Sequence, residues 1–481
     1  MIHNVGIGVA TYPQVVLQGR MPSEDRPAEV AGAMPGETTM PKRQAGDTWW
    51  WILAVLLMLW PVMLVFLTPG RSGGPAPLWF WSALLLCAWM LMAMGGRERP
   101  PVEDIGPRVL QEREQPALVR ELMRVDAATE EPDGTQTFRG RLTQSADAAY
   151  ARLRSAFGRE TVPLLQEDPS SPAAIVLIPA PVERAALRRE IRPWVHWLLF
   201  LLTMATTTWA GAAHQGIDVL REPARVFAGL PYSLTLMAIL GVHELGHYFM
   251  ARRHGIHVTP PYFIPVPMAL GTFGAFIQMR SPIDNRRALF DVAVAGPLAG
   301  LAVAIPALLI GLQTSVILPP ASAAHPMMGG TSVGSSLLFA LLAKVSMGSS
   351  LEYGHVLGLS PLAFAGWLGL LVTALNLLPI GQLDGGHIAY ATFGRRIGVV
   401  VSTVAMWSLV LLAVFVWPGL TMWAILVFFM AGRAVPPLND LSPLPPVRRV
   451  LGIASLAILL LILMPLPHAL WSAAGFHCPY L

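Results

Sequence analysis

A short apolar stretch near the middle of the chain, Ile239–Tyr248, contains the residues best suited to catalysis. It includes a His-Glu-x-x-His pattern formed by His243, Glu244 and His247. A four-residue spacing places both imidazoles on one face of a helix, one turn apart. Two such imidazoles can bind one Zn²⁺ at about 2.0–2.1 Å, and the glutamate can act as a general base toward water on the metal. The pattern therefore predicts one zinc ion per chain, with Glu244 as a catalytic residue.

The surroundings of this pattern favour a metal site over a chance match. A five-residue pattern with two free positions also recurs in proteins that bind no metal. Here, however, two histidines and a glutamate lie in the hydrophobic part of a predicted membrane helix, where ionisable side chains are costly unless they have a function. We therefore expect a metal ion, although the pattern does not identify the third ligand.

The composition indicates a membrane protein. The 481 residues are 54% hydrophobic and only 13% charged, which is too apolar for a soluble globular protein. The positive charges are almost all arginine and the net charge is only +4, so we predict no nucleic-acid partner. Of the two cysteines, Cys87 lies in an apolar run, and no disulfide framework with Cys478 is expected.

Runs of about 20 apolar residues predict about nine transmembrane helices. The predicted crossings are Trp49–Leu67, Leu78–Met94, Pro193–Ala213, Phe227–Met250, Ala288–Leu312, Pro361–Leu383, Ile397–Trp417, Leu420–Met430 and Val450–Leu466. They divide the chain into a disordered N-terminal tail (1–47), a transmembrane hairpin (48–95), a soluble domain (96–192), a metal-binding membrane core (193–394) and C-terminal transmembrane helices (395–481). The predicted fold is a polytopic α-helical membrane protein with a small soluble α+β domain inserted after the second span.

The soluble domain is predicted from charged sequence that lacks long apolar runs. Helical spacing covers Val109–Val125, and a second helix is expected from a Ser145 cap to Phe157, with Gly158 ending it. The predicted strands are Thr137–Leu142, Val162–Gln166 and Ala174–Ile178. The domain has no His or Cys, so we expect a structural or regulatory part rather than a second metal site.

Two further apolar segments are not expected to cross the membrane. Pro260–Met279 contains four prolines and two glycines, which disfavour a helix, so we predict extended segments at Tyr262–Val266 and Thr272–Met279. Non-helical backbone at membrane depth must lie against protein or a wet cavity. Ser335–Ala343 is too short to cross.

The positive-inside rule indicates the depth of the metal motif. Arg252 and Arg253 end the predicted helix and are expected to face the cytoplasm. His243 precedes Arg252 by nine residues, or about 13 Å along a helix. The metal is therefore expected inside the bilayer, nearer its cytoplasmic face.

Asp384 is the predicted third ligand. A catalytic zinc usually has three protein ligands. An acidic residue at membrane depth is energetically costly and therefore indicates a function. Asp384 is expected to close the inward span Pro361–Leu383, at a depth similar to that of His247. Gly385 and Gly386 would permit a tight bend beside the metal. The alternative is an ordinary turn at the membrane surface.

Asn376 is a second predicted catalytic residue. It lies two helical turns before Asp384, and its amide could stabilise the oxyanion that forms when water attacks a carbonyl. A helix–helix hydrogen bond is the alternative. Among the other histidines, His254 and His257 are expected to be solvated, and a surface position is favoured for His387 over a role behind the metal ligands.

The motifs together resemble the site-2 protease family of intramembrane zinc metalloproteases, especially its plant and cyanobacterial chloroplast-type branch. The resemblance rests on His243–His247, on Leu383–Gly386 and on the linking stretches Ile264–Pro267, Gly271–Ile277, Ala295–Gly300 and Ala365–Trp367. It covers about 227–394. One departure is that Gly381 and Gln382 stand where many members have a second proline.

The resemblance implies hydrolysis of peptide bonds inside the membrane, in or near the transmembrane segment of a single-pass protein. The expected partners are such a substrate and membrane lipids; no oligomeric state follows from the sequence. The expected location is the bacterial cytoplasmic membrane, with the active site toward the cytoplasm. The extended Tyr262–Met279 region could bind an unwound substrate by adding it as a strand.

Two other functions remain open at this point. A membrane prenyl-protein peptidase also uses a His-Glu-x-x-His pattern, but a glutamate on a later helix completes its site, which the pair Asn376 and Asp384 disfavours. A zinc-binding scaffold or transporter without proteolytic activity is the second alternative, and it would not require Glu244.

Overall fold

A computed structural model describes residues 108–158, 161–168, 170–179, 193–266, 270–318, 336–348, 356–415, 424–425, 427–428 and 436–464. The predicted tail (1–47) and first transmembrane hairpin (48–95) lie outside the described residues, as does most of the predicted span Leu420–Met430.

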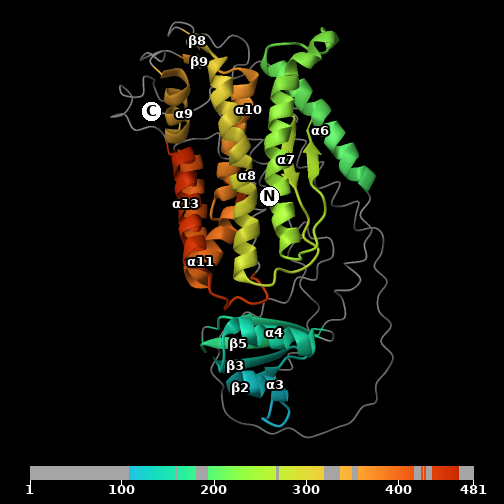
Figure 1. The fold of residues 1–481 in the computed structure, drawn as a ribbon, viewed down its shortest axis with the longest axis vertical. Helices are drawn as coiled ribbons and strands as arrows, with labels where there is room; N and C mark the ends of the chain where they lie inside the picture. The colour runs from blue at the N-terminus through green and yellow to red at the C-terminus, as the bar shows by residue number, and fades with distance from the viewer. Residues whose placement is uncertain are drawn as a thin grey trace. The chain divides into compact units, whose positions relative to one another are not determined.

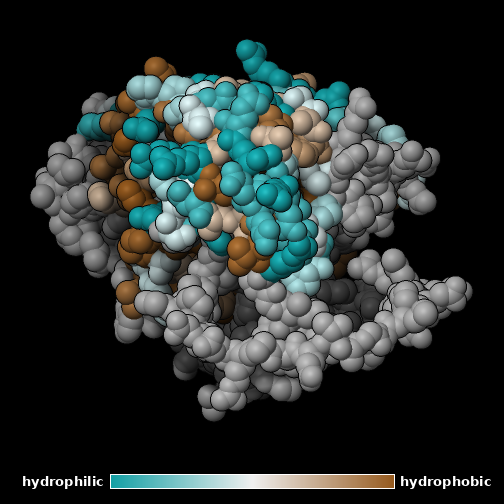
Figure 2. Space-filling view, turned by 90° about the horizontal axis from the view of Figure 1, so that it is seen from below, coloured by the Kyte–Doolittle hydropathy of each residue, from teal (hydrophilic) through white to brown (hydrophobic). Residues whose placement is uncertain are grey.

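The soluble part of the chain contains a five-stranded antiparallel sheet with two helices, which we call the sheet domain (108–179). Its strands are β1 (Arg108–Val109), β2 (Met123–Glu130), β3 (Gln136–Leu142), β4 (Thr161–Gln166) and β5 (Ala173–Pro179), in the order β1-β2-β3-β5-β4 (Figure 1). Its helices are α3 (Ala117–Leu122) and α4 (Ala146–Phe157). The residues of this domain that face the viewer in Figure 2 are mostly hydrophilic, as expected for a domain in water.

Most of the predicted elements of the sheet domain are confirmed. The three predicted strands correspond to β3, β4 and β5, and Ser145 accepts a hydrogen bond from the Ala148 amide at the start of α4, which ends before Gly158. The single helix predicted over Val109–Val125 is wrong. Only Ala117–Leu122 is helical, because the residues that follow pair with both β1 and β3, and this tertiary pairing outweighs local helical spacing.

The membrane part of the chain consists of helices joined by short irregular segments. They are α6 (Pro193–His214), α7 (Leu230–Arg253, after the 3₁₀ turn η1, Pro223–Gly229), α8 (Arg286–Gln313), α9 (Leu337–Met347), α10 (Pro361–Leu377), α11 (Asp384–Phe415) and α13 (Pro446–Leu463). Within the described residues, four helical segments are long and apolar enough to cross a membrane, namely 223–253, 286–313, 384–413 and 446–463. The described helices α6 and α10 are not among these four.

The starts of the core helices follow from local sequence. The Asn285 side chain accepts a hydrogen bond from the Ala288 amide at the first turn of α8, and Ser360 does the same for Ala363 in α10. Pro361 occupies the first position of α10, where its missing N–H is tolerated.

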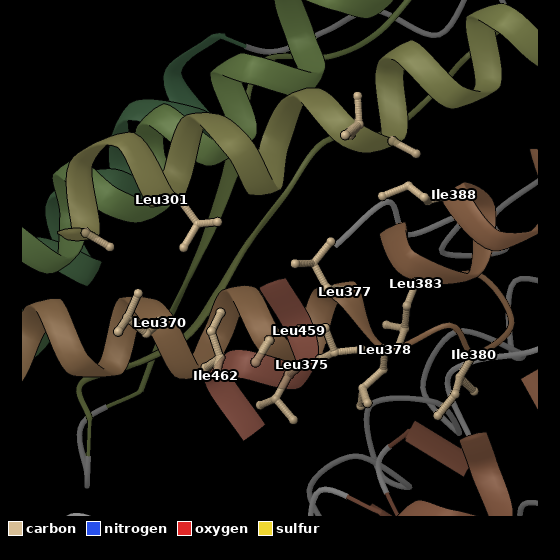
Figure 3. Close-up of a cluster of buried hydrophobic side chains, with 14 of the residues drawn as sticks. Leu301, Leu370, Leu375, Leu377, Leu378, Ile380, Leu383, Ile388, Leu459 and Ile462 are labelled. Carbon is tan, nitrogen blue, oxygen red and sulfur yellow. The ribbon is translucent and has the colours of Figure 1, made fainter. Parts of the chain in front are cut away.

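Small residues let the core helices approach closely. A Cβ added at Gly246 of α7 would lie 2.6 Å from the Ala295 carbonyl oxygen of α8, and one at Gly366 of α10 would lie 2.7 Å from the Leu308 amide nitrogen of α8. Such contacts are typical of helices that pack in a membrane. Figure 3 shows leucine and isoleucine side chains from α8, α10, α11 and α13 pointing into one buried cluster, together with those of the loop between α10 and α11.

The proline-rich region after α7 forms a β-hairpin, as the sequence predicts. Strands β6 (Tyr262–Pro265) and β7 (Thr272–Phe276) are antiparallel. Two hydrogen bonds hold its turn: the Thr206 hydroxyl donates to the Gly271 carbonyl at 2.7 Å, and the Tyr232 hydroxyl donates to the Leu270 carbonyl at 3.0 Å. The non-helical backbone is thus attached to α6 and α7.

The predicted span Pro361–Leu383 is shorter in the structure. Helix α10 ends at Leu377, and Leu378–Leu383 forms a non-helical turn in which Gly381 has a φ of 51°. Asp384 therefore begins α11 instead of closing the preceding span. The backbone therefore requires a glycine at Gly381, because its φ is positive. The sequence alone does not show which of the neighbouring glycines adopts this conformation.

Candidate metal centre

Three side chains from two separate parts of the fold converge on one point. His243 and His247 lie one turn apart on α7, and Asp384 is the first residue of α11. Their side-chain atoms are close: His243 Nε2 lies 3.2 Å from His247 Nε2, and Asp384 Oδ2 lies 3.4 Å and 3.2 Å from these two nitrogens. All three residues are buried.

The donor atoms fit a single zinc ion. Ligands held at about 2.0–2.1 Å in a tetrahedron are about 3.3 Å apart, which matches the three observed separations. Among the described residues, no hydrogen-bond donor satisfies either carboxylate oxygen of Asp384, although this side chain is 0% exposed. A buried carboxylate of this kind is costly unless a cation neutralises it. Two imidazoles and one carboxylate also form a common donor set for catalytic zinc, with a fourth position left for water.

A neighbouring helix orients one of the imidazoles. His247 Nδ1 lies 2.7 Å from the Val292 carbonyl oxygen of α8, so this nitrogen carries the proton and donates it. The lone pair of Nε2 is then directed toward the other donors, which is the tautomer that binds a metal.

Two glycines on α8 provide the space for both imidazoles. A Cβ at Gly296 would lie 2.1 Å from His247 Nε2, and one at Gly300 would lie 3.1 Å from His243 Nδ1. Neither glycine was assigned to the site from the sequence. Their four-residue spacing on one helix face was the available signal, but both entered only as part of the Ala295–Gly300 stretch of the family resemblance.

Glu244 and Asn376 both lie beside the donor atoms. Glu244 follows the first imidazole on α7, and its side chain is buried. Asn376 comes from the last turn of α10, and its Nδ2 lies 3.2 Å from His243 Nε2. A bound metal would occupy the lone pair of that nitrogen, which leaves the amide hydrogens to donate elsewhere in the site.

The start of α11 packs tightly against the turn before it. A Cβ at Gly385 would lie 1.8 Å from the Leu377 carbonyl oxygen, and one at Gly386 would lie 2.3 Å from that of Gly381. The two glycines therefore serve close packing inside the first turn of a helix, and not the bend beside the metal that was expected from the sequence.

Two expectations for the remaining histidines are wrong. His387 is buried on the first turn of α11, because its helix start is enclosed, and a surface position is excluded. His254 is only partly exposed, with its Nε2 3.0 Å from Asp291 Oδ2, since α7 packs along α8. His257 is exposed, as expected.

The model of Peptidase family M50 matches residues 231–417, which include all three donor residues. Among curated proteins, a probable zinc metalloprotease EGY2, chloroplastic, from Oryza sativa subsp. indica is 30% identical over 343 residues, covering 68% of this chain and 60% of that protein. The Arabidopsis thaliana protein of the same name is 30% identical over 360 residues, covering 71% and 62%.

The probable zinc metalloprotease EGY1, chloroplastic, from Arabidopsis thaliana is 29% identical over 338 residues, covering 64% of this chain and 61% of that protein. The chain thus spans about three fifths of the length of these relatives. No solved structure matches the chain.

Proposed function

The chain belongs to peptidase family M50, the site-2 protease family, and we propose that it is an intramembrane zinc metalloprotease that hydrolyses peptide bonds in or near the transmembrane segments of other membrane proteins. The observation that carries the proposal is the convergence of His243, His247 and Asp384, with donor atoms 3.2–3.4 Å apart and a buried glutamate beside them.

The proposed roles divide between one metal ion and two side chains. His243, His247 and Asp384 hold the zinc, which when bound lowers the pKa of a water molecule toward about 7 and polarises the scissile carbonyl. Glu244 accepts the proton of the attacking water and delivers it to the leaving amine. Asn376 donates from its amide to the oxyanion that develops on the carbonyl oxygen.

The hairpin β6–β7 provides a way to hold the substrate. A transmembrane helix hides its carbonyls in its own hydrogen bonds, so it must unwind locally before attack. In the described residues, β6 and β7 form a two-stranded sheet, which leaves one edge of β7 available to pair with an extended peptide. Phe273 on β7 is 46% exposed and could contact that peptide.

The family and the long apolar helices indicate that this chain is a membrane protein. We propose three more specific features. The first is a total of about nine transmembrane helices around the soluble domain, with the domain limits given from sequence. The second is a single-pass transmembrane protein as substrate. The third is the bacterial cytoplasmic membrane with a cytoplasm-facing site. This last statement draws no support from the relatives, whose names place them in chloroplasts.

The experiment that tests the function compares cells that carry the native chain with cells that carry Glu244→Gln. Quantitative proteomics of membrane fractions should find cleaved transmembrane fragments only with the native chain. Both chains should contain the same amount of zinc, because glutamine removes the base and leaves the three donors. The same fragments from both cells, or a cellular phenotype that survives the substitution, would favour a scaffold or transporter instead.

A further inference from the structure

A short segment before α13 is joined to the edge of the sheet domain. The amide of Leu165 in β4 donates to the Leu438 carbonyl at 2.7 Å, and the amide of Asp440 donates to the Leu165 carbonyl at 2.8 Å. Since β4 is the last strand in the sheet order, these bonds form a parallel β-bridge on an edge of the sheet that no other described strand covers. We call Leu438–Ser442 the coupling segment.

The opposite side of the coupling segment is bonded to the chain that leads into α8. The amide of Leu438 donates to the Ile283 carbonyl at 2.9 Å, and the amide of Asn439 donates to the Asp284 carbonyl at 2.8 Å. The Leu438 side chain is buried in the core of the sheet domain. Three residues therefore tie the sheet domain to the start of a helix that lines the metal centre.

The Asp440 side chain contacts α11. The Tyr390 hydroxyl donates to Asp440 Oδ2 at 2.7 Å, and Asp440 Oδ1 lies 3.8 Å from Arg286 Nε. Burial raises the pKa of Asp440, while the hydrogen bond from Tyr390 and the charge of Arg286 act in the opposite direction. Because a buried carboxylate is costly, the loss of either partner should loosen this contact.

Arg286 connects the same three parts of the fold. Its Nη2 lies 3.4 Å from the Tyr390 carbonyl oxygen of α11, and its Nη1 lies 3.8 Å from Glu167, just after β4. Its amide donates to the Ser442 hydroxyl at 3.1 Å. One guanidinium group is therefore shared by the sheet domain, the coupling segment and α11.

Tyr390 and Asp384 lie on one short rigid piece of helix. They are six residues apart, or about 9 Å along the axis. Helical geometry runs without interruption from Asp384 to Gly394, where φ is 83° and the helix kinks. A displacement of Tyr390 therefore displaces the carboxylate of Asp384, while the chain beyond Gly394 can stay in place.

We propose that the coupling segment positions Asp384 for metal binding, and that attachment of the sheet domain thereby controls the metal centre. Tyr390 and Asp440 act as positioning residues, since neither touches the donor atoms. The inference rests on the proposed function only in taking Asp384 as a zinc ligand; it does not require that the chain cleave peptides. Loss of a residue that orients a metal ligand lowers metal affinity about 10–100-fold.

The first test measures the zinc affinity of the purified full chain, by competition with a fluorescent chelator, in a Glu244→Gln background that removes the proposed general base. Tyr390→Phe and Asp440→Asn should each raise the Kd for Zn²⁺ by about 10–100-fold. The Kd of the double variant should be no higher than that of the single variant with the higher Kd, because both substitutions remove the same contact.

Glu121→Gln is the matched control for the loss of a carboxylate. Glu121 pairs with Arg152 at 2.8 Å inside the sheet domain, and this ion pair does not involve the coupling segment or α11. The substitution should therefore leave the Kd within about twofold. An unchanged Kd in Tyr390→Phe, or an equal loss of affinity in Glu121→Gln, overturns the inference without contradicting the proposed protease.

The second test uses the reciprocity of coupled equilibria. If the sheet contact affects zinc binding, zinc must affect the sheet contact by the same free energy. Hydrogen–deuterium exchange of peptides covering 161–168 and 436–445 should slow when Zn²⁺ is added to the full chain, and Tyr390→Phe should abolish the slowing. If the chain binds Zn²⁺ but the exchange rates of these peptides do not change, the inference is contradicted. A chain that binds no zinc contradicts both this inference and the proposed function.

Discussion

A single methyl group at Gly296 should disable the metal centre. In the structure, a Cβ at this position would lie 2.1 Å from His247 Nε2, whereas ordinary contact begins at 3.4 Å. Gly296→Ala therefore requires His247 Nε2 or the α8 backbone to move by about 1.3 Å, the difference between these two distances. A metal–ligand distance tolerates only about 0.2 Å of variation, so His247 should be lost as a ligand.

The size of the effect follows from the number of ligands. Zinc held by four protein ligands has a binding free energy of about 10–16 kcal/mol, so one ligand contributes about 3 kcal/mol. Loss of His247 should then weaken zinc binding by about 100-fold. The assay is chelator competition on the purified full chain, together with zinc content after dialysis.

Two other glycines provide graded controls. A Cβ at Gly300 would lie 3.1 Å from His243 Nδ1, so Gly300→Ala requires a shift of only about 0.3 Å and should cost less than tenfold in Kd. A Cβ at Gly241 of α7 would have its nearest neighbour, Phe263 Cζ, at 3.8 Å, so Gly241→Ala should bind zinc normally. The reasoning is refuted if Gly296→Ala binds zinc as tightly as the native chain, or if all three variants are weakened alike.

Three further predictions concern catalysis and stability. Asn376→Ala should retain zinc but lower kcat by about 10²–10³-fold, measured on a cleaved membrane substrate, and an unchanged kcat would restrict Asn376 to helix packing. Phe273→Glu on β7 should raise KM about tenfold, the factor for 1.4 kcal/mol, with zinc content intact; unaltered cleavage would count against strand addition. In the sheet domain, burial of Asp168 is outweighed by hydrogen bonds from Ser170 and by Arg139, so the pKa of Asp168 is lowered. Its stabilisation is present above the pKa of an unfolded aspartate, about 3.9, and is lost as pH falls through the lowered value. Hydrogen exchange of the sheet peptides should show this acid loss, about 1–3 kcal/mol, and Asp168→Asn should abolish it.

Local sequence predicted the elements whose ends are set by local chemistry. Ser145 and Gly158 bound α4 because a hydroxyl cap and a glycine act over a single turn. The prolines of the hairpin excluded a helix there for an equally local reason. The approach of the two imidazoles could be predicted because a four-residue spacing fixes His243 and His247 relative to each other in any helix.

What the sequence could not provide were contacts between distant segments. Asp384 was assigned to the end of one helix, whereas it begins the next, because local pattern does not show where a glycine-rich turn stops. His387 was placed at the surface, since its burial depends on how α11 packs. The roles of Gly296 and Gly300 depend on which face of α8 meets the imidazoles, and only the packed structure shows that face.

The most direct test of the metal centre is X-ray absorption at the zinc edge on the zinc-loaded full chain. The spectrum should show one zinc per chain with two imidazole nitrogens and one carboxylate oxygen from the protein, and Asp384→Asn should change it. A chain that binds no zinc, or a spectrum that Asp384→Asn leaves unchanged, would contradict a centre in which the first residue of α11 meets the two histidines of α7.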